Sequence, residues 1–429
     1  MAKVDTPLIN GDKCVTKNYQ SRISTIFCMV STILGSTVLS LPWATARAGT
    51  VSGIITPLAT CFISCLTAIQ IVQIASNFFD SRFDVAVQEY LGISGIALVR
   101  MASFFVLLIA ALLYHCIMAD NISSLGLPFL TRKSLPTIVS ILLLPVLLSR
   151  NSTFIVNMAA FLGFPSSLCL VTFIFFKSIQ EPSLNKLEAV GEDPFGLAGI
   201  LMLSFFLHNL IIPISKKSNP KTLKADVLIA FVITCSIYLL VGITAGMAFG
   251  DELLLKDIEN ILLVFKPTPL TNFVRVAVAI QLFCSYTVVF NVLRTEIKYL
   301  YGKSLHIRSV LVVLPIFTFI ATMTDKLGVI AGIGGKFSGI IYVFSVPAIT
   351  YVVFLKKSGA SKVKRFFYYH FMIIALLFCL FSITGSSLVQ LFVDYRSISM
   401  LVVFSFLFII ETYYITVYRK DKDDYKNIV

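Results

Sequence analysis

The sequence predicts an all-helical protein that crosses a membrane many times. Hydrophobic residues make up 57% of its 429 residues and charged residues only 13%, whereas a soluble domain carries about 25% charged residues. Apolar runs of roughly 20 residues, long enough to span a bilayer as a helix, follow one another along the chain. Two of these runs contain clustered polar residues followed by a proline. Composition and apolar runs therefore predict the fold class, and the two interrupted runs indicate where its chemistry lies.

Twelve apolar runs are bounded by charged or turn-forming stretches, and each predicts one membrane-spanning helix. They cover residues 23–46, 51–77, 95–119, 135–149, 152–176, 195–215, 225–249, 270–293, 309–324, 327–355, 366–391 and 397–418. The runs 135–149 and 309–324 are short and closely followed by the next run, so each could instead form one long segment with its successor. The sequence thus predicts 11 or 12 spanning helices.

The distribution of Lys and Arg predicts the orientation of these helices. With the N-terminus in the cytoplasm, the inner segments carry 23 Lys and Arg and the outer segments carry 9. Because cytoplasmic loops are enriched in these residues, both the tail 1–22 and the tail 419–429 are predicted to be cytoplasmic. The formal net charge of +13 is then explained by Lys and Arg on the cytoplasmic side, where they face anionic lipid. No nucleic-acid partner is expected.

Several classes of protein are excluded by what the predicted spans contain. Eight of the nine cysteines lie in apolar segments and no CxxC motif occurs, which argues against a disulfide framework or a structural metal. An intramembrane enzyme would need paired acids, a nucleophile–base set or metal-ligand spacing, and the spans show none of these. We therefore expect no enzyme, no structural metal and no cofactor beyond a coupling ion, and no obligate protein partner is evident.

The two interrupted runs are "STILGSTVLSLPW" at 31–43 and "LSFFLHNLIIPI" at 203–214. Irregular backbone inside a membrane is tolerated only around a protected or wet cavity. The runs are the first and the sixth, so two five-helix units of opposite orientation, 23–177 and 195–355, would place them at matching positions. Two peripheral helices at 363–418 would follow. The alternative for each run is a proline-kinked helix with packing serines, which is common in membrane bundles.

Five motifs resemble the amino acid/auxin permease family. "STILGSTVLSLPWATARAG" (31–49) looks like the family's first-helix signature, and "FFLHNLIIPISKKSNPKTLKADVLIAFVITCSIYLLVGITAGMAFGD" (205–251) resembles its second. "YHCIMADN" (114–121), "VRVAVAIQLFCSYTVVFNVLR" (274–294) and "GGKFSGIIYVFSVPAITYV" (334–352) resemble the third, eighth and tenth helices of members. The similarity covers about residues 20–391 and is nearest to the solute carrier family 38 branch.

This resemblance implies a leucine-transporter-type fold with a five-plus-five inverted repeat and discontinuous helices one and six. It also implies secondary transport of amino acids by alternating access, as a symporter or antiporter, with Na⁺ or H⁺ as candidate coupling ions. The substrate contacts that it implies are Thr32, Ile33, Gly35, Ser36, Thr37, Tyr114, Phe205, His208 and Asn209. Amides near Gly35–Thr37 would hold the substrate carboxylate, and carbonyls of the second break would hold its ammonium group.

The candidate ligands of a coupling ion depart from the family's sodium-coupled members. Those members use an asparagine where this chain has Ser31 and a threonine most nearly matched by Ser285, with Leu34 as a third candidate. Hydroxyl and carbonyl oxygens still ligate a hard cation, but the lost amide argues against sodium coupling. His208 could carry a proton, although a structural or substrate-lining role is favoured.

Two cations inside predicted spans draw attention. Lys336 lies about 13 Å into its span at 1.5 Å per residue, among three glycines. A charge at such depth predicts a role in gating or in replacing a coupling cation, and the alternative is a lysine that reaches the surface along its apolar stem. Arg275, near the end of another span, is expected to reach the interface in that way.

The expected function is thus secondary transport of amino acids across the plasma membrane or a vacuolar or lysosomal membrane. The bilayer and the amino acid are the expected partners. An amino-acid sensor of the same fold is the first alternative, and a transporter of another small organic solute is the second.

Overall fold

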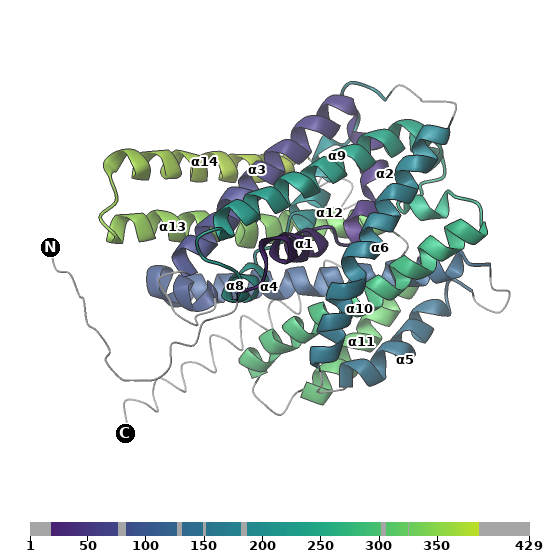
Figure 1. The fold of residues 1–429 in the computed structure, drawn as a ribbon, viewed down its shortest axis with the longest axis horizontal. Helices are drawn as coiled ribbons and strands as arrows, with labels where there is room; N and C mark the ends of the chain where they lie inside the picture. The colour runs from purple at the N-terminus through teal and green to yellow at the C-terminus, as the bar shows by residue number, and fades with distance from the viewer. Residues whose placement is uncertain are drawn as a thin grey trace.

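The computed structural model describes residues 19–75, 83–126, 131–148, 152–181, 187–301, 306–324 and 326–385. Helices form most of these residues, and no β-strand occurs among them (Figure 1). Within the described ranges, six helical segments are long and apolar enough to span a membrane, and four shorter apolar helices accompany them. The predicted all-helical class is therefore confirmed. The predicted helix 397–418, the tail 419–429 and residues 1–18 lie outside the described residues.

Each of the first eleven predicted runs contains at least one helix. The helices are α1 Arg22–Ile33, η1 Ser36–Leu39, α2 Leu41–Ala48, α3 Thr50–Ala75, α4 Phe83–Ser123, α5 Leu135–Leu148, α6 Ser152–Gln180, α7 Pro194–Ser204, α8 Ile211–Lys217, α9 Leu223–Leu255, η2 Ile261–Leu263, α10 Pro269–Tyr301, α11 His306–Met323, α12 Leu327–Ser338, η4 Gly339–Ser345, α13 Val346–Lys357 and α14 Lys362–Gly385. The short runs 135–149 and 309–324 form helices separate from their successors.

Three of the predicted runs are discontinuous in the structure. The first is divided into α1, the single 3₁₀ turn η1 and α2, and the sixth is divided into α7 and α8. The tenth run is interrupted by η4, which is a π-helical turn between α12 and α13. The first two interruptions were predicted, but the third was not. Because π-helical turns in helices are frequent at functional sites, η4 adds a third irregular segment to the bundle.

Helix α4 is much longer than its predicted run and changes direction at one glycine. Its 41 residues are interrupted at Gly92, which has φ 71° and ψ −159°. Glycine adopts this backbone without the steric cost that a Cβ atom brings. Arg100, predicted inside the span, donates to Asp84 on the other side of the kink at 3.1 Å. This ion pair holds the two parts of α4 together.

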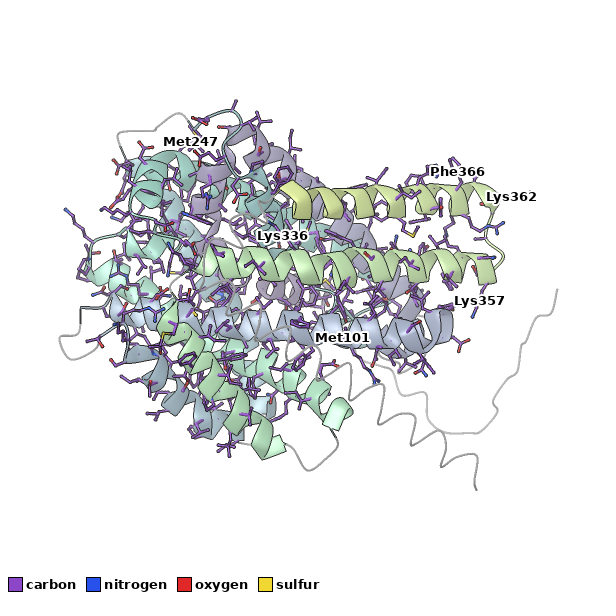
Figure 2. The ribbon with its side chains drawn as sticks, turned by 180° about the vertical axis from the view of Figure 1, so that it is seen from behind. Met101, Met247, Lys336, Lys357, Lys362 and Phe366 are labelled. Carbon is purple, nitrogen blue, oxygen red and sulfur yellow. The ribbon has the colours of Figure 1, made fainter. Side chains whose placement is uncertain are left out.

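The described helices pack in two sets, which α12 and the packing of α6 against α9 join. Helices α2 and α3 contact each other and both contact α7 and α9, while α10 packs against α4, α5, α6 and α11. Helix α12 contacts α7 in the first set and α4 in the second. Helices α13 and α14 lie side by side and extend beyond the rest of the bundle (Figure 1). Figure 2 shows Lys336 on α12, with Lys357 and Lys362 near the turn that joins α13 to α14.

Candidate functional site

The first helix stops where glycine and hydroxyl residues replace apolar ones. The Leu34 N–H still donates to the Val30 carbonyl at 2.8 Å, and the chain then turns at Gly35 with φ −21° and ψ −158° before η1 begins. Pro42 lies in the first turn of α2, where its missing N–H costs no hydrogen bond. The first N–H groups of η1, beginning near Ser36, have no acceptor within their own helix. The break therefore offers polar backbone groups inside an apolar bundle.

The second break lies between α7 and α8. The Phe205 N–H donates to the Leu201 carbonyl at 2.9 Å and completes α7. The N–H groups of Leu210 and Ile211 both donate to the Leu207 carbonyl, each at 2.9 Å. Residues 205–210 therefore form a tight turn and not a helix, as the polar residues and the proline of this run predict.

Side chains join the two breaks to each other. The Ser204 hydroxyl at the end of α7 donates to Thr37 Oγ1 of η1 at 2.7 Å. The hydroxyl of Tyr238, on α9, donates to the Ile33 carbonyl at 2.7 Å and lies 3.4 Å from the Ser204 carbonyl oxygen. Carbonyls at the ends of α1 and α7 thus lie near one hydroxyl, and the two breaks lie next to each other.

Tyr114 of α4 covers the first break. Its hydroxyl lies 3.5 Å from the position that a Cβ atom would occupy at Gly35, which is ordinary van der Waals contact. A narrow gap, too small to hold a water molecule, lies next to η1. The residues that line it are uncharged: Ser36, Thr37, Leu39, Ser40, Leu113, Ile117, Leu327 and Ala331. No charged side chain therefore lines this gap, and the polar groups of the break are backbone groups and hydroxyls.

The polar residues of the second break point to neighbouring helices. His208 is 1% exposed, and its Nε2 lies 2.9 Å from the hydroxyl of Thr67 on α3. Because that hydroxyl donates to backbone carbonyls of α3, Nε2 is the donor in this contact. The amide oxygen of Asn209 accepts from Ser103 on α4 at 3.3 Å. His208 Nδ1 and Asn209 Nδ2 have no partner among the described residues, so both residues tie the break to the bundle and keep one polar atom free.

The other predicted contacts contribute chiefly backbone or packing. Phe205 is fully buried. Its ring centroid lies 6.0 Å from that of Phe231 on α9, in a stacked arrangement, and 5.1 Å from that of Tyr238, which it meets edge-on. The hydroxyl of Thr32 donates within its own helix to the Cys28 carbonyl at 2.7 Å. These side chains fix the shapes of the two breaks.

No contact in the described part of the chain joins the candidate coupling-ion ligands Ser31 and Ser285. Ser31 Oγ lies 2.7 Å from where a Cβ atom would stand at Gly163 of α6, so the serine faces that helix closely. Gln281, one turn before Ser285 on α10, donates to Ser167 of α6 at 2.8 Å. Leu34 is 2% exposed at the end of α1. The described residues hold no cluster of three or more His, Cys, Asp or Glu suited to a metal.

Lys336 lies where α12 crosses α7 very closely. A Cβ atom on Gly335 would stand 1.8 Å from the Gly199 carbonyl oxygen. A Cβ atom on Gly199 would stand 2.9 Å from Cε of Lys336. The lysine stem therefore lies over Gly199, and the glycines that flank it permit the crossing. Asp193, before the first turn of α7, is the acidic group that acts on the lysine electrostatically.

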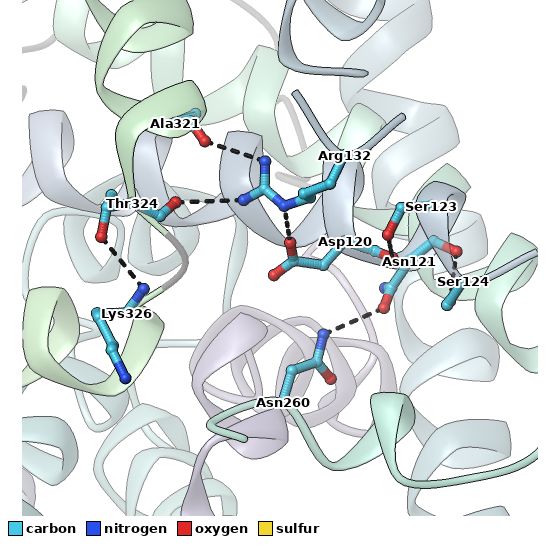
Figure 3. A network of polar contacts seen from close by, with 9 residues as sticks. All are labelled: Asp120, Asn121, Ser123, Ser124, Arg132, Asn260, Ala321, Thr324 and Lys326. Atoms are coloured by element: carbon cyan, nitrogen blue, oxygen red, sulfur yellow. Dashed lines mark hydrogen bonds and ion pairs between the residues drawn. The ribbon is translucent and has the colours of Figure 1, made fainter. Parts of the chain in front are cut away.

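A polar network connects the ends of α4 and α11 (Figure 3). Asp120 of α4 forms an ion pair with Arg132, and both are largely buried. The same guanidinium donates to the carbonyls of Ala321 and Thr324, at 3.0 and 3.3 Å, at the end of α11. The Thr324 hydroxyl accepts from the Lys326 N–H at 3.2 Å. These contacts hold Arg132 and the end of α4 against the end of α11, and no motif in the sequence indicated them.

Arg275 does not reach the surface, and that expectation is wrong. It is 2% exposed, because its guanidinium donates to carbonyls that the helices around it leave free. Nη1 donates to Ser124 and to the Asn272 side chain, and Nη2 donates to Leu262 and Phe265, all at 2.8–3.1 Å. The residue thus holds the segment before α10 against α4.

Comparison of the sequence with known proteins identifies its family. Residues 19–392 match the family described as "Transmembrane amino acid transporter protein". The chain is 23% identical to the neutral amino acid transporter 9 of Xenopus tropicalis, over 83% of this chain and 78% of the relative. It is 21% identical to the sodium-coupled neutral amino acid transporter 9 homolog of Caenorhabditis elegans, over 83% and 72%, and 21% identical to the neutral amino acid transporter 9 of Rattus norvegicus, over 80% and 75%. The chain is therefore a multi-pass membrane protein that belongs to the transmembrane amino acid transporter family.

Proposed function

We propose that this protein moves amino acids across a membrane by alternating access, with the substrate bound between the two helix breaks. The observation that carries the proposal is the joining of these breaks. Tyr238 lies against the end of α1 and the end of α7, and Ser204 donates to Thr37. Discontinuous helices that meet in this way supply oppositely polarised helix ends, which suit an ion with a carboxylate and an ammonium group.

Each break takes one end of the substrate. Amides at Gly35, Ser36 and Thr37 donate to the carboxylate, because N–H groups at a helix start attract anions. Carbonyls of residues 205–210 accept from the ammonium group, with Phe205, His208 and Asn209 shaping that turn. Tyr114, Thr32 and Ile33 line the site from α4 and α1.

We propose neutral amino acids as the substrate class. The residues around η1 are uncharged, and a buried charged side chain on the substrate would need a partner to offset its desolvation. The names of the relatives refer to neutral amino acids. A basic or acidic substrate would require a countercharge that is not among the residues lining this gap.

Coupling to an ion forms a separate part of the proposal. Ser31, Leu34 and Ser285 are the candidate ligands if Na⁺ drives transport, and His208 is the candidate carrier if H⁺ does. The serine in place of asparagine favours H⁺ or the substrate's own gradient. Lys336 is proposed to act in gating, since it rests on the helix that leads to the second break. Both tails are proposed to face the cytoplasm from a plasma, vacuolar or lysosomal membrane.

The decisive experiment is uptake of a labelled amino acid panel into proteoliposomes, with sodium and pH gradients imposed separately. We expect uptake of at least one neutral amino acid above that of protein-free liposomes. Binding of an amino acid with no uptake under any gradient would favour the sensor. An absence of both binding and uptake would refute the amino acid function.

The placement of the site is tested at Gly35. Replacing it with leucine puts a branched side chain against the Tyr114 hydroxyl, and we expect the variant to insert normally but to lose substrate binding. Gly35→Ala is the matched control, because its Cβ atom would make ordinary contact at 3.5 Å. We expect this control to retain uptake. Normal uptake by Gly35→Leu would refute the placement.

A further inference from the structure

A second candidate binding site lies on the side of the bundle, away from the two breaks. Helices α4, α5 and α10 form a groove of about 290 Å³. Its walls are apolar, and Leu142, Val276 and Ile280 at its margins are 42–55% exposed. In a membrane protein such residues face hydrocarbon, so the groove is open to the lipid phase. Two polar residues also line it, Asn121 of α4 and Arg275 of α10.

Arg275 brings a positive charge that no carboxylate of the described residues pairs with. Its two Nη atoms donate to three carbonyls and one side-chain amide, which satisfies hydrogen bonds but leaves the net charge uncompensated. Its Nε has no hydrogen-bond partner among the described residues. A buried charge without a counterion is costly, so an anion at this position would be strongly favoured.

Asn121 supplies a second free donor whose identity is fixed by its neighbours. The Leu262 N–H donates to Oδ1 of Asn260 at 3.1 Å, so the Nδ2 of Asn260 is the atom that faces Asn121. It donates to Oδ1 of Asn121 at 3.3 Å (Figure 3). The atom of Asn121 left without a partner in the described chain is therefore Nδ2. Both unpaired atoms are donors and belong to residues that line this groove, and only an acceptor can satisfy them.

We propose that this groove binds a long-chain fatty acid, with its carboxylate at Arg275 and Asn121. Two carboxylate oxygens match two donors, and the negative charge offsets the guanidinium. The chain then follows α10 from Arg275 toward Phe283, eight residues or about 12 Å along the helix. Entry is lateral from the bilayer. A small headgroup suits donors that lie within the bundle better than a bulky phospholipid headgroup does.

A neighbouring groove provides an internal comparison. Helices α5 and α11 form one of about 510 Å³ that is also largely apolar. Its polar residues are uncharged hydroxyl residues, Thr137, Ser140, Thr318 and Thr322. Three of them have partners: Thr318 donates to Leu314, Thr322 donates to Thr318, and Ser140 pairs with Thr318. If apolar surface alone attracted a lipid, this larger groove would be preferred. The proposal requires the smaller groove, because only it combines a charge with unpaired donors.

The test uses the full chain in nanodiscs of phosphatidylcholine and a palmitic acid that carries a diazirine at mid-chain. After irradiation, mass spectrometry of peptides locates the crosslinks. We expect them on α4, α5 and α10 at this groove, and we expect excess palmitate to abolish them while cetyl alcohol, of the same chain length, does not.

Variants then separate the headgroup contact from the fold. Asn121→Asp keeps the oxygen that accepts from Asn260 but replaces the free donor with an anionic acceptor. We expect it to retain a normal thermal transition and to lower crosslinking by about tenfold or more, since hydrogen bonds to charged groups are the strong ones. Thr318→Val, in the larger groove, is the control and should leave crosslinking unchanged.

Four results would overturn the proposal: equal crosslinking in the α5–α11 groove, equal competition by cetyl alcohol, unchanged crosslinking of Asn121→Asp, or stronger competition by an acidic phospholipid or a sterol than by palmitate. Each contradicts a carboxylate held at Arg275 and Asn121. Amino acid uptake does not enter this readout, so the proposal stands or falls apart from the transport function.

Discussion

Replacing Tyr238 with phenylalanine tests whether the two helix breaks depend on each other. The ring is 1% exposed, so the substitution removes one hydroxyl and leaves the packing against Phe205 in place. That hydroxyl donates to the Ile33 carbonyl at 2.7 Å and lies 3.4 Å from the Ser204 carbonyl oxygen. Without it, a buried carbonyl at the end of α1 loses its donor. The lost hydrogen bond destabilises the backbone at the proposed substrate site.

The expected loss follows from the burial of that carbonyl. Leaving a buried acceptor unsatisfied costs about 1–3 kcal/mol, which corresponds to a factor of about 5–150 in an equilibrium constant. We expect apparent substrate affinity in proteoliposome uptake to fall by a factor in this range. The thermal transition should also move down. Uptake over a range of substrate concentrations and thermal unfolding in detergent measure the two effects.

Tyr286→Phe is the matched control for this experiment. Tyr286 is also fully buried in a long helix, stacks on Phe290 at 5.9 Å, and its hydroxyl has no partner among the described residues. Deleting an unpaired buried hydroxyl removes a desolvation cost, so we expect unchanged or slightly raised stability and normal uptake. If Tyr238→Phe behaves like Tyr286→Phe, the hydroxyl does not hold the breaks together and the reasoning is wrong.

Two further perturbations test the contacts around the site. Gly335→Ala places a Cβ atom 1.8 Å from a backbone oxygen of α7, whereas Gly332→Ala places one 3.8 Å from the nearest atom. We expect Gly335→Ala to lower the free energy of unfolding by about 3 kcal/mol or more, and Gly332→Ala to be neutral or slightly stabilising. Equal effects of the two substitutions would contradict the close crossing of α7 and α12. Asp226→Asn weakens the contact with Arg22 at 2.9 Å, where the Asp226 side chain is 1% and the Arg22 side chain 53% exposed. Because half-exposed ion pairs contribute at most about 1 kcal/mol, we expect the rate of thiol labelling at Cys28 on α1 to rise, by up to about fivefold. An unchanged rate would mean that the ion pair does not restrain α1.

The helix breaks were predictable because their causes are local. A glycine between hydroxyl residues, or a histidine and asparagine before a proline, weakens a helix at the place where the residues stand. The break after Ile33 and the break after Ser204 therefore appear where the residues indicate. The kink at Gly92 has an equally local cause, but it falls outside the predicted span and was missed.

The contacts that join the breaks were not predictable, because they link residues far apart in the sequence. Tyr238 occurs in a run of apolar residues, and only its hydroxyl indicated that it needs a partner when buried. Nothing near it in the sequence points to the Ile33 carbonyl. Arg275 was misjudged for a related reason. Its position near the end of the span suggested that it reaches the surface, while the carbonyls that hold it come from two separate segments, one after α4 and one before α10.

Lys336 shows how a close helix crossing alters the meaning of a charged residue. The sequence placed a lysine among glycines inside a span, with two alternatives: a role in gating or charge compensation, or a side chain that reaches the membrane surface. In the structure the same glycines bring the backbone of α12 against α7, and the lysine stem lies over Gly199. Gly199 is five residues, or about 7.5 Å of helix, from Ser204 at the second break. A displacement of α7 along α12 would move the second break and change the surroundings of the charge together, and the gating role proposed for Lys336 rests on this coupling.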